Sequence, residues 1–160
     1  MNCAEFIVEY LEKEGVEYCF GLCGHSIVSM LDALSRSSKI KYISFRHEQL
    51  AAHAADAYFR ATHKVGALLL HVGPGLTNAV AGVVNAAMDS SPIIVISANA
   101  PIYHSGIGAL QDIMFYSDMS QIDLYKPFVK RAWKIDNTSQ LKNTLLKAFS
   151  LALHGRPGPV

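Results

Sequence analysis

The middle of this chain is almost free of charge. From Val65 to Gln111 the sequence runs for 47 residues with one charged side chain, Asp89, although the 160 residues together carry 27 Lys, Arg, Asp and Glu. Buried segments avoid charge, because an unpaired charge is costly to remove from water. We therefore expect most of this stretch to be buried. We also expect part of it to face another protein surface, since one domain of this size rarely hides so much apolar chain.

The uncharged stretch does not have the pattern of a membrane span. His71, the Gly73-Pro74-Gly75 break and Pro92 interrupt each apolar run before it reaches the ~20 residues that a bilayer needs. The net charge is +1, so there is no basic field to attract nucleic acid or an anionic membrane. The chain has three cysteines and no basic, apolar leader at its start, which favours a reduced, cytoplasmic compartment.

Strand and helix periodicities alternate along the chain. A helix is expected between Asn2 and Gly15, with Asn2 and Glu5 forming a capping box at its start. Further helices are expected at 27–34, 48–61, 76–88 and 139–154, and strands at 17–20, 41–45, 65–70, 93–97 and 128–135. The strands at 65–70 and 93–97 are apolar on both faces, as in a parallel sheet covered by helices. The predicted fold class is α/β, a doubly wound parallel sheet with helices on both faces, in one domain over residues 1–160. Residues 99–123 are expected to form a functional loop.

In an open α/β sheet, ligands bind where the strands end. The residues expected there are 21–25, 46–48, 71–75 and those from 98 onward. Glu48 has two readings: a carboxylate that the positive end of a helix favours, or a functional acid. His25, His47 and His71 fall at strand ends and are either core residues or site residues. The turn at 73–78 either packs tightly or brings backbone amides to an anion.

The spacing of histidines and cysteines predicts no metal site. His47 and His53 are six residues apart, about 240° around a helix, whereas a zinc helix needs its histidines on one face. Cys19 and Cys23 span a strand end and a turn rather than a Cys-x-x-C hairpin. Thiols without a ligand role are the simpler interpretation of both cysteines.

Five motifs follow one another in a fixed order. They are Phe20-Gly21-Leu22-Cys23-Gly24, the run from Arg46-His47-Glu48 to Asp56-Ala57-Tyr58, Gly73-Pro74-Gly75-Leu76-Thr77-Asn78, Gly108-Ala109-Leu110-Gln111-Asp112, and Gly155-Arg156-Pro157-Gly158-Pro159-Val160. Together they resemble the N-terminal, pyrimidine-binding domain of thiamine diphosphate enzymes, in the acetolactate synthase-like branch. The resemblance covers essentially the whole chain.

The resemblance implies a cofactor and the residues that hold its pyrimidine ring. Glu48 matches the family's glutamate, which hydrogen-bonds the ring nitrogen N1′ of thiamine diphosphate. A proton shared with N1′ favours the imino tautomer, whose nitrogen removes the thiazolium C2 proton to give the nucleophilic ylid. Gly75 and Asn78 match the turn that approaches the pyrimidine.

The resemblance also implies residues that face the substrate. Gln111 matches the glutamine of a Phe-Gln-Glu motif, which here reads Leu110-Gln111-Asp112. The branch commonly has Pro-Gly-Gly in the first turn, where this chain has Cys23-Gly24-His25. The imidazole of His25 either orients a carbonyl or carboxylate of the substrate or narrows the pocket. Gly24, His25 and Gln111 are therefore the predicted substrate residues.

The same resemblance implies a metal site, partner subunits and further domains that lie outside this chain. The family holds the diphosphate through Mg²⁺ with a Gly-Asp-Gly motif of another domain, and this sequence contains none. The active site forms between subunits, so a homodimer or homotetramer is expected. A flavin, which some relatives bind on a middle domain, is possible but not indicated. Because Gly158-Pro159-Val160 reads as a turn that launches another strand, we expect a fragment of a three-domain chain.

The implied function is the N-terminal domain of a thiamine diphosphate-dependent 2-oxo acid decarboxylase, carboligase or lyase, inactive by itself. Two alternatives remain from the sequence. The first hypothesis is a stand-alone α subunit of a two-chain enzyme. The second is a non-catalytic module that binds a small anion with the turn at 73–78.

Overall fold

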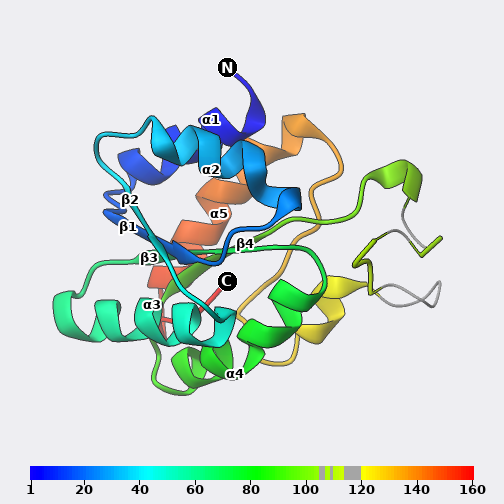
Figure 1. Ribbon diagram of the computed structural model, residues 1–160. Coiled ribbons are helices and arrows are strands. Elements are labelled where there is room, and N and C mark those ends of the chain that lie inside the picture. The colour runs from blue at the N-terminus through cyan, green and yellow to red at the C-terminus, as the bar shows by residue number, and fades with distance from the viewer. Residues whose placement is uncertain (105–106, 109, 114–119) are drawn as a thin grey trace.

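The computed structural model is a four-stranded sheet between two layers of helices (Figure 1). It describes residues 1–104, 107–108, 110–113 and 120–160. The strands are β1 (Tyr18–Gly21), β2 (Lys41–Ser44), β3 (Gly66–Leu70) and β4 (Ile93–Ser97). The α-helices are α1 (Cys3–Lys13), α2 (Val28–Ser35), α3 (Glu48–Thr62), α4 (Pro74–Met88) and α5 (Leu141–Leu153), and none of these is long and apolar enough to cross a membrane. The order is β2-β1-β3-β4 with every pair parallel, which confirms the predicted α/β class.

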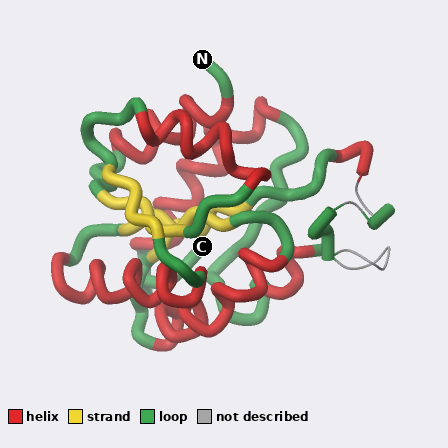
Figure 2. Tube along the Cα trace, in the orientation of Figure 1, coloured by secondary structure: helices red, strands yellow, loops and turns green. Residues whose placement is uncertain are grey.

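The sheet is covered on both faces, as the apolar strands require (Figure 2). Helices α1, α2 and α5 pack on one face, and α3 and α4 on the other. Within β3, Ala67 and Leu69 join the first core cluster, and Leu68 and Leu70 join the second. The alternation of side chains along a strand thus supplies both cores from one segment.

Helices α3 and α4 approach each other closely. Gly82 of α4 faces α3, and a Cβ atom built on it would lie 2.5 Å from the Cβ of Ala52. Farther along, the buried Asp56 of α3 accepts a hydrogen bond of 2.9 Å from Asn85 of α4 and pairs with Arg60 at 3.3 Å. This packing fixes where α3 begins relative to α4.

The uncharged middle divides into a buried and an exposed part. All five residues of β3 are buried, as are Val83 and Ala86 on the inner side of α4. Farther along, four large apolar side chains stay exposed: Ile102, Tyr103, Ile107 and Leu110. The expectation of burial is therefore confirmed for the strand and the helix but not for this later segment.

The predicted strand at 128–135 is wrong. Residues 131–136 have no regular structure, and the segment meets the C-terminal residues through a bond of 2.9 Å from Lys130 N to Pro159 O. The place beside β4 belongs instead to Val160, which donates to Ile93 O at 3.0 Å and accepts from Val95 N at 2.8 Å. The apolar periodicity reflects Val129 and Trp133, which pack against the two cores.

Other differences are confined to ends and loops. Helix α4 begins at Pro74, two residues earlier than expected, because proline suits the first position of a helix. A 3₁₀ turn, η1 (His25–Ile27), precedes α2, and another, η4 (Thr138–Gln140), precedes α5. The expected loop at 99–123 contains η2 (Ile102–His104) and η3 (Gln121–Leu124), and its residues 105–106, 109 and 114–119 lie outside the described residues.

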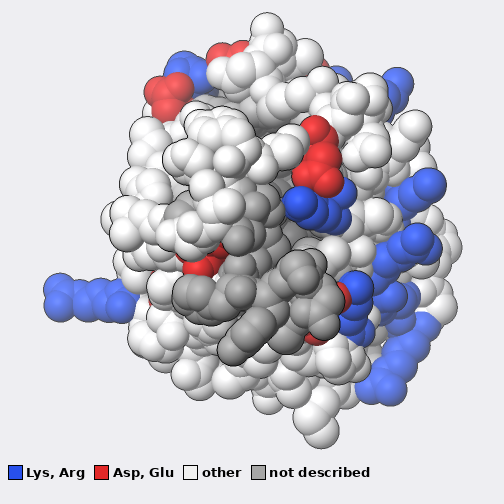
Figure 3. All heavy atoms as spheres, turned by 90° about the vertical axis from the view of Figure 1, so that its right-hand side faces the viewer, with Lys and Arg blue, Asp and Glu red and all other residues white. Residues whose placement is uncertain are grey.

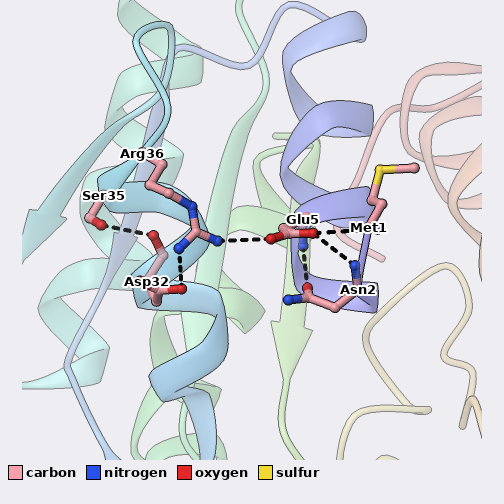
Figure 4. A network of polar contacts seen from close by, with 6 residues as sticks. All are labelled: Met1, Asn2, Glu5, Asp32, Ser35 and Arg36. Carbon is pink, nitrogen blue, oxygen red and sulfur yellow. Dashed lines mark hydrogen bonds and ion pairs between the residues drawn. The ribbon is translucent and has the colours of Figure 1, made fainter.

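The start of α1 is held by the capping box that the sequence predicts (Figure 4). The side chain of Asn2 accepts from Glu5 N at 2.9 Å, and Glu5 accepts from Asn2 N at 2.8 Å. Glu5 also pairs with Arg36, just after α2, at 3.1 Å. The cap therefore lies in a polar network that joins α1 to the end of α2.

Replacing Asn2 with alanine is expected to lower the free energy of unfolding by about 1 kcal/mol, because the helix loses its cap acceptor. Chemical denaturation monitored by circular dichroism measures the change. The control is Asn143→Ala, an exposed position in α5, where the higher helix propensity of alanine is expected to raise stability by up to about 0.6 kcal/mol rather than lower it. Equal effects of the two changes would contradict a stabilising role for the cap.

Candidate functional site

The parallel strands bring three turns to one edge of the sheet. The residues after β1, β2 and β3 are 22–27, 45–47 and 71–73. All three strands run in the same direction, so these turns meet at their carboxyl ends. The predicted residues Gly24, His25, Glu48 and Gly75 come from these turns or from the helices that follow them.

Glu48 is the first residue of α3 and is almost completely buried, with 6% of its surface exposed. Asn78 of α4 donates its side-chain amide to Glu48 Oε2 at 3.0 Å. Glu48 Oε1 receives no hydrogen bond from the described residues. Glu48 thus occupies the first turn of α3, where the amino end of the helix favours its negative charge, and its role as a functional acid stays a prediction.

Gly75 provides the space beside this carboxylate. A Cβ atom built on Gly75 would lie 3.4 Å from Glu48 Oε1 and 3.1 Å from the Cβ of His71. Any larger side chain would fill the space in front of Oε1. The structure thus brings Glu48, Gly75 and Asn78 into one place.

The predicted substrate residues meet around His71, the residue after β3. A Cβ atom on Gly24 would lie 2.6 Å from the His71 ring, so only glycine fits there. The ring of His25, an exposed side chain, lies edge-on to that of His71, with 4.6 Å between centroids. Gln111 meets the other side, where its Oε1 hydrogen-bonds His71 Nε2. Of the motif around Gln111, residue 109 lies outside the described residues.

The turn at 73–78 is anchored by amide side chains. Gly73 N donates to Oε1 of the buried Gln121 at 2.7 Å, and Gln121 in turn bonds Asn99. Gly73 has φ +62°, and a Cβ atom on it would lie 1.9 Å from Gln111 O, so this position requires glycine. The Gly73 amide is therefore already used within the protein, which counts against a role for it in binding an anion.

Comparison with known proteins identifies the family. Residues 1–122 match the family described as "Thiamine pyrophosphate enzyme, N-terminal TPP binding domain". The chain belongs to this family. Similar curated proteins are the acetolactate synthase large subunits of Haemophilus influenzae (41% identical) and Escherichia coli K12 (isozyme 3, 40% identical), and the probable large subunit of Methanococcus aeolicus (42% identical). Each match covers the whole of this chain and 27%, 27% and 26% of the relative, so the chain spans about a quarter of their length.

Within this TPP binding domain, two residues that the motifs did not identify, His71 and Ser26, lie beside the predicted substrate residues. His71 is buried, with 7% of its surface exposed, and its Nδ1 hydrogen-bonds the hydroxyl of Ser26. The sequence placed His71 at a strand end, which was the available signal, but nothing in the spacing connects it to Ser26 or Gln111. These pairs are 45 and 40 residues apart and meet only in the folded sheet.

The described part of the TPP binding domain contains no cluster of three or more His, Cys, Asp or Glu that could hold a metal ion. Cys3 and Cys23 are exposed free thiols, and Cys19 is completely buried. Burial raises the pKa of the Cys19 thiol to about 12, so this sulfur stays protonated at neutral pH. Its chemistry fits a core residue rather than a ligand.

A cleft elsewhere in the domain does not coincide with the site. It has a volume of about 520 Å³ and lies between β4, α5 and residues 132–138, and it includes none of the predicted site residues. Figure 3 shows the side of the molecule that lies to the right in Figure 1, where most of the visible Lys and Arg side chains lie along one border. We place the candidate site at Glu48, because its carboxylate lies beside Gly75, and Gly75 in turn lies beside His71.

Proposed function

We propose that this chain is the pyrimidine-binding part of an enzyme that uses thiamine diphosphate to decarboxylate or ligate a 2-oxo acid, as a lyase or a transferase. One observation carries the proposal: Glu48 is buried at the start of a helix and has one oxygen without a partner among the described residues, next to a glycine that leaves space. The similarity to acetolactate synthase large subunits supports the same class.

The residues around Glu48 fit an aminopyrimidine ring. Glu48 Oε1 would share a proton with the ring nitrogen N1′, and a buried site strengthens such a bond because little water competes. Asn78 holds Oε2 at 3.0 Å and so fixes the orientation of the carboxylate. Gly75 lets the ring approach the carboxylate without a clash. When bound, thiamine diphosphate supplies the carbon nucleophile that attacks the carbonyl carbon of the substrate.

Gly24, His25 and Gln111 form the proposed substrate side of the site. Gly24 gives room to the ring of His71, and His25 exposes an imidazole beside it. Gln111 offers an amide, which can bind a carbonyl or carboxylate oxygen. A small anionic 2-oxo acid matches this set of donors.

The proposal includes partners. The diphosphate and Mg²⁺ would be held by residues outside this chain, since the sequence has no Gly-Asp-Gly motif. The exposed side chains Ile102, Tyr103, Ile107 and Leu110 support a contact with another protein surface, because exposed apolar side chains close together in a chain mark such contacts. We propose a homodimer or homotetramer with the active site between subunits.

Calorimetry with thiamine diphosphate and Mg²⁺ tests the proposal. The complete protein is expected to bind the cofactor, and residues 1–160 alone are expected to bind it too weakly to detect. Circular dichroism and thermal unfolding of the isolated chain show whether it is folded under the same conditions. Tight binding by the folded isolated chain would support the small-anion module instead, and no binding by the complete protein would overturn the proposed function.

A further inference from the structure

His71 hydrogen-bonds residues from two separate segments on the proposed substrate side. It is buried, and both of its ring nitrogens have hydrogen-bond partners, Ser26 on Nδ1 and Gln111 on Nε2. Ser26 lies in the turn after β1, and Gln111 lies in the segment that follows β4. A histidine with both nitrogens engaged is held in one orientation and one tautomer.

The direction of these hydrogen bonds follows from the amide oxygen of Gln111, which can only accept. Val72 N can only donate, and it donates to Ser26 Oγ at 3.2 Å. The Ser26 oxygen can accept this bond whichever way it bonds His71 Nδ1, so the other ring nitrogen decides the direction. His71 Nε2 therefore donates to Gln111 Oε1, and a neutral imidazole protonated at Nε2 accepts from the Ser26 hydroxyl at Nδ1. One chain of bonds therefore runs from the backbone of Val72 to the side chain of Gln111.

Gln111, the last residue in this series of hydrogen bonds, has an unfavourable backbone conformation. Gln111 has φ +62°, in the left-handed region that costs about 1 kcal/mol for a residue with a Cβ atom. Its carbonyl oxygen lies 1.9 Å from where a Cβ atom of residue 73 would be, so only glycine fits at that position. The contacts with His71 and Gly73 offset this cost, which is typical of a residue that the fold must hold in place for function.

We propose that His71, as the Nε2–H tautomer, is the positioning residue that orients Gln111 toward the substrate. By engaging Oε1, it leaves the two N–H donors of the Gln111 amide for an acceptor oxygen of the substrate. An inverted amide would present its oxygen and repel a carboxylate. The inference rests on the proposed function, since it assigns a role within the same site.

A pair of isosteric variants separates the two bonds of His71. The amide nitrogen of Gln reaches the place of Nε2, whereas the amide of Asn reaches only the place of Nδ1. In the complete protein, His71→Asn is expected to raise KM for a 2-oxo acid about tenfold with little change in kcat, as the loss of one hydrogen bond predicts. His71→Gln is expected to restore most of that loss.

The kinetic test uses pyruvate, 2-oxobutyrate and phenylglyoxylate as probes. Gln111→Ala and the double variant His71→Asn/Gln111→Ala complete a double-mutant cycle, in which the double variant is expected to equal Gln111→Ala, because His71 acts only through Gln111. His63→Asn is the control, since His63 is exposed at the left-handed end of α3, where Asn is well tolerated. Additive effects, or a His71→Gln variant as impaired as His71→Asn, would overturn the inference.

A second measurement needs neither substrate nor cofactor. Selective ¹⁵N-histidine labelling of the complete protein, with the His71 signals assigned by their loss in His71→Asn, reports which ring nitrogen carries the proton. We expect a protonated Nε2 and an unprotonated Nδ1, and an Nδ1–H tautomer would overturn the inference. If the complete protein fails to bind thiamine diphosphate, the proposed function fails. The NMR measurement still tests the hydrogen bonds of His71, because it needs no cofactor.

Discussion

Replacing Glu48 with glutamine in the complete protein is expected to slow deuterium exchange at C2 of bound thiamine diphosphate by a factor of about 100 to 10,000, the range for loss of a group that manages a proton. Glutamine keeps the shape of the side chain and can still accept from Asn78, so the packing around α3 remains. It cannot share a proton with N1′ as a carboxylate does. The exchange rate, followed by proton NMR after acid quench, measures the loss.

Two further measurements make this result specific. Cofactor affinity from calorimetry is expected to fall far less than the exchange rate, because the substitution leaves Gly75 and the space in front of the side chain unchanged. Glu9→Gln is the control, since Glu9 is exposed on α1 and pairs with Lys13 on the same helix. An exchange rate in Glu48→Gln equal to that of the unmodified protein would show that another group activates the cofactor.

The layers of the fold could be predicted because they depend on local patterns. The uncharged run at 65–70 has no polar face, so it can only be an inner strand with helices on both sides, as β3 is. The capping box at Asn2 and Glu5 fixed the start of α1 for a similarly local reason. The strand prediction at 128–135 failed, because Val160 already occupies the place beside β4, which the local pattern could not show.

The site was only partly predictable, for a reason of distance along the chain. Glu48, Gly75 and Asn78 were predicted from their motifs, but the hydrogen bond from Asn78 to Glu48 joins residues 30 apart and could not be predicted from local sequence. His71 stood at a predicted strand end without any sign of its partners. Its importance follows from Gly24, whose missing Cβ atom leaves room for the His71 ring, and this contact forms only when β1 and β3 pair.

Replacing Gly82 with valine is expected to lower the free energy of unfolding by about 3 kcal/mol, near the upper end for adding side-chain volume to a packed interface. Helix propensity alone predicts the opposite sign for Gly82→Ala, a gain of about 1 kcal/mol. Packing decides, because a Cβ atom on Gly82 would lie 2.5 Å from the Cβ of Ala52 and 2.9 Å from Gln49 O, and backbone cannot move aside at low cost. Denaturant unfolding of the complete protein measures both changes.

The same substitution connects stability to the site. Ala81→Val is the control, because Ala81 is the adjacent residue of α4 and is exposed, so the change is expected to cost only the difference in helix propensity, about 0.6 kcal/mol. Gly82→Val is also expected to weaken cofactor binding, since a wider gap between α3 and α4 moves Asn78 away from Glu48. If Gly82→Val unfolds like Ala81→Val, the close approach of the two helices does not limit the side-chain volume at position 82.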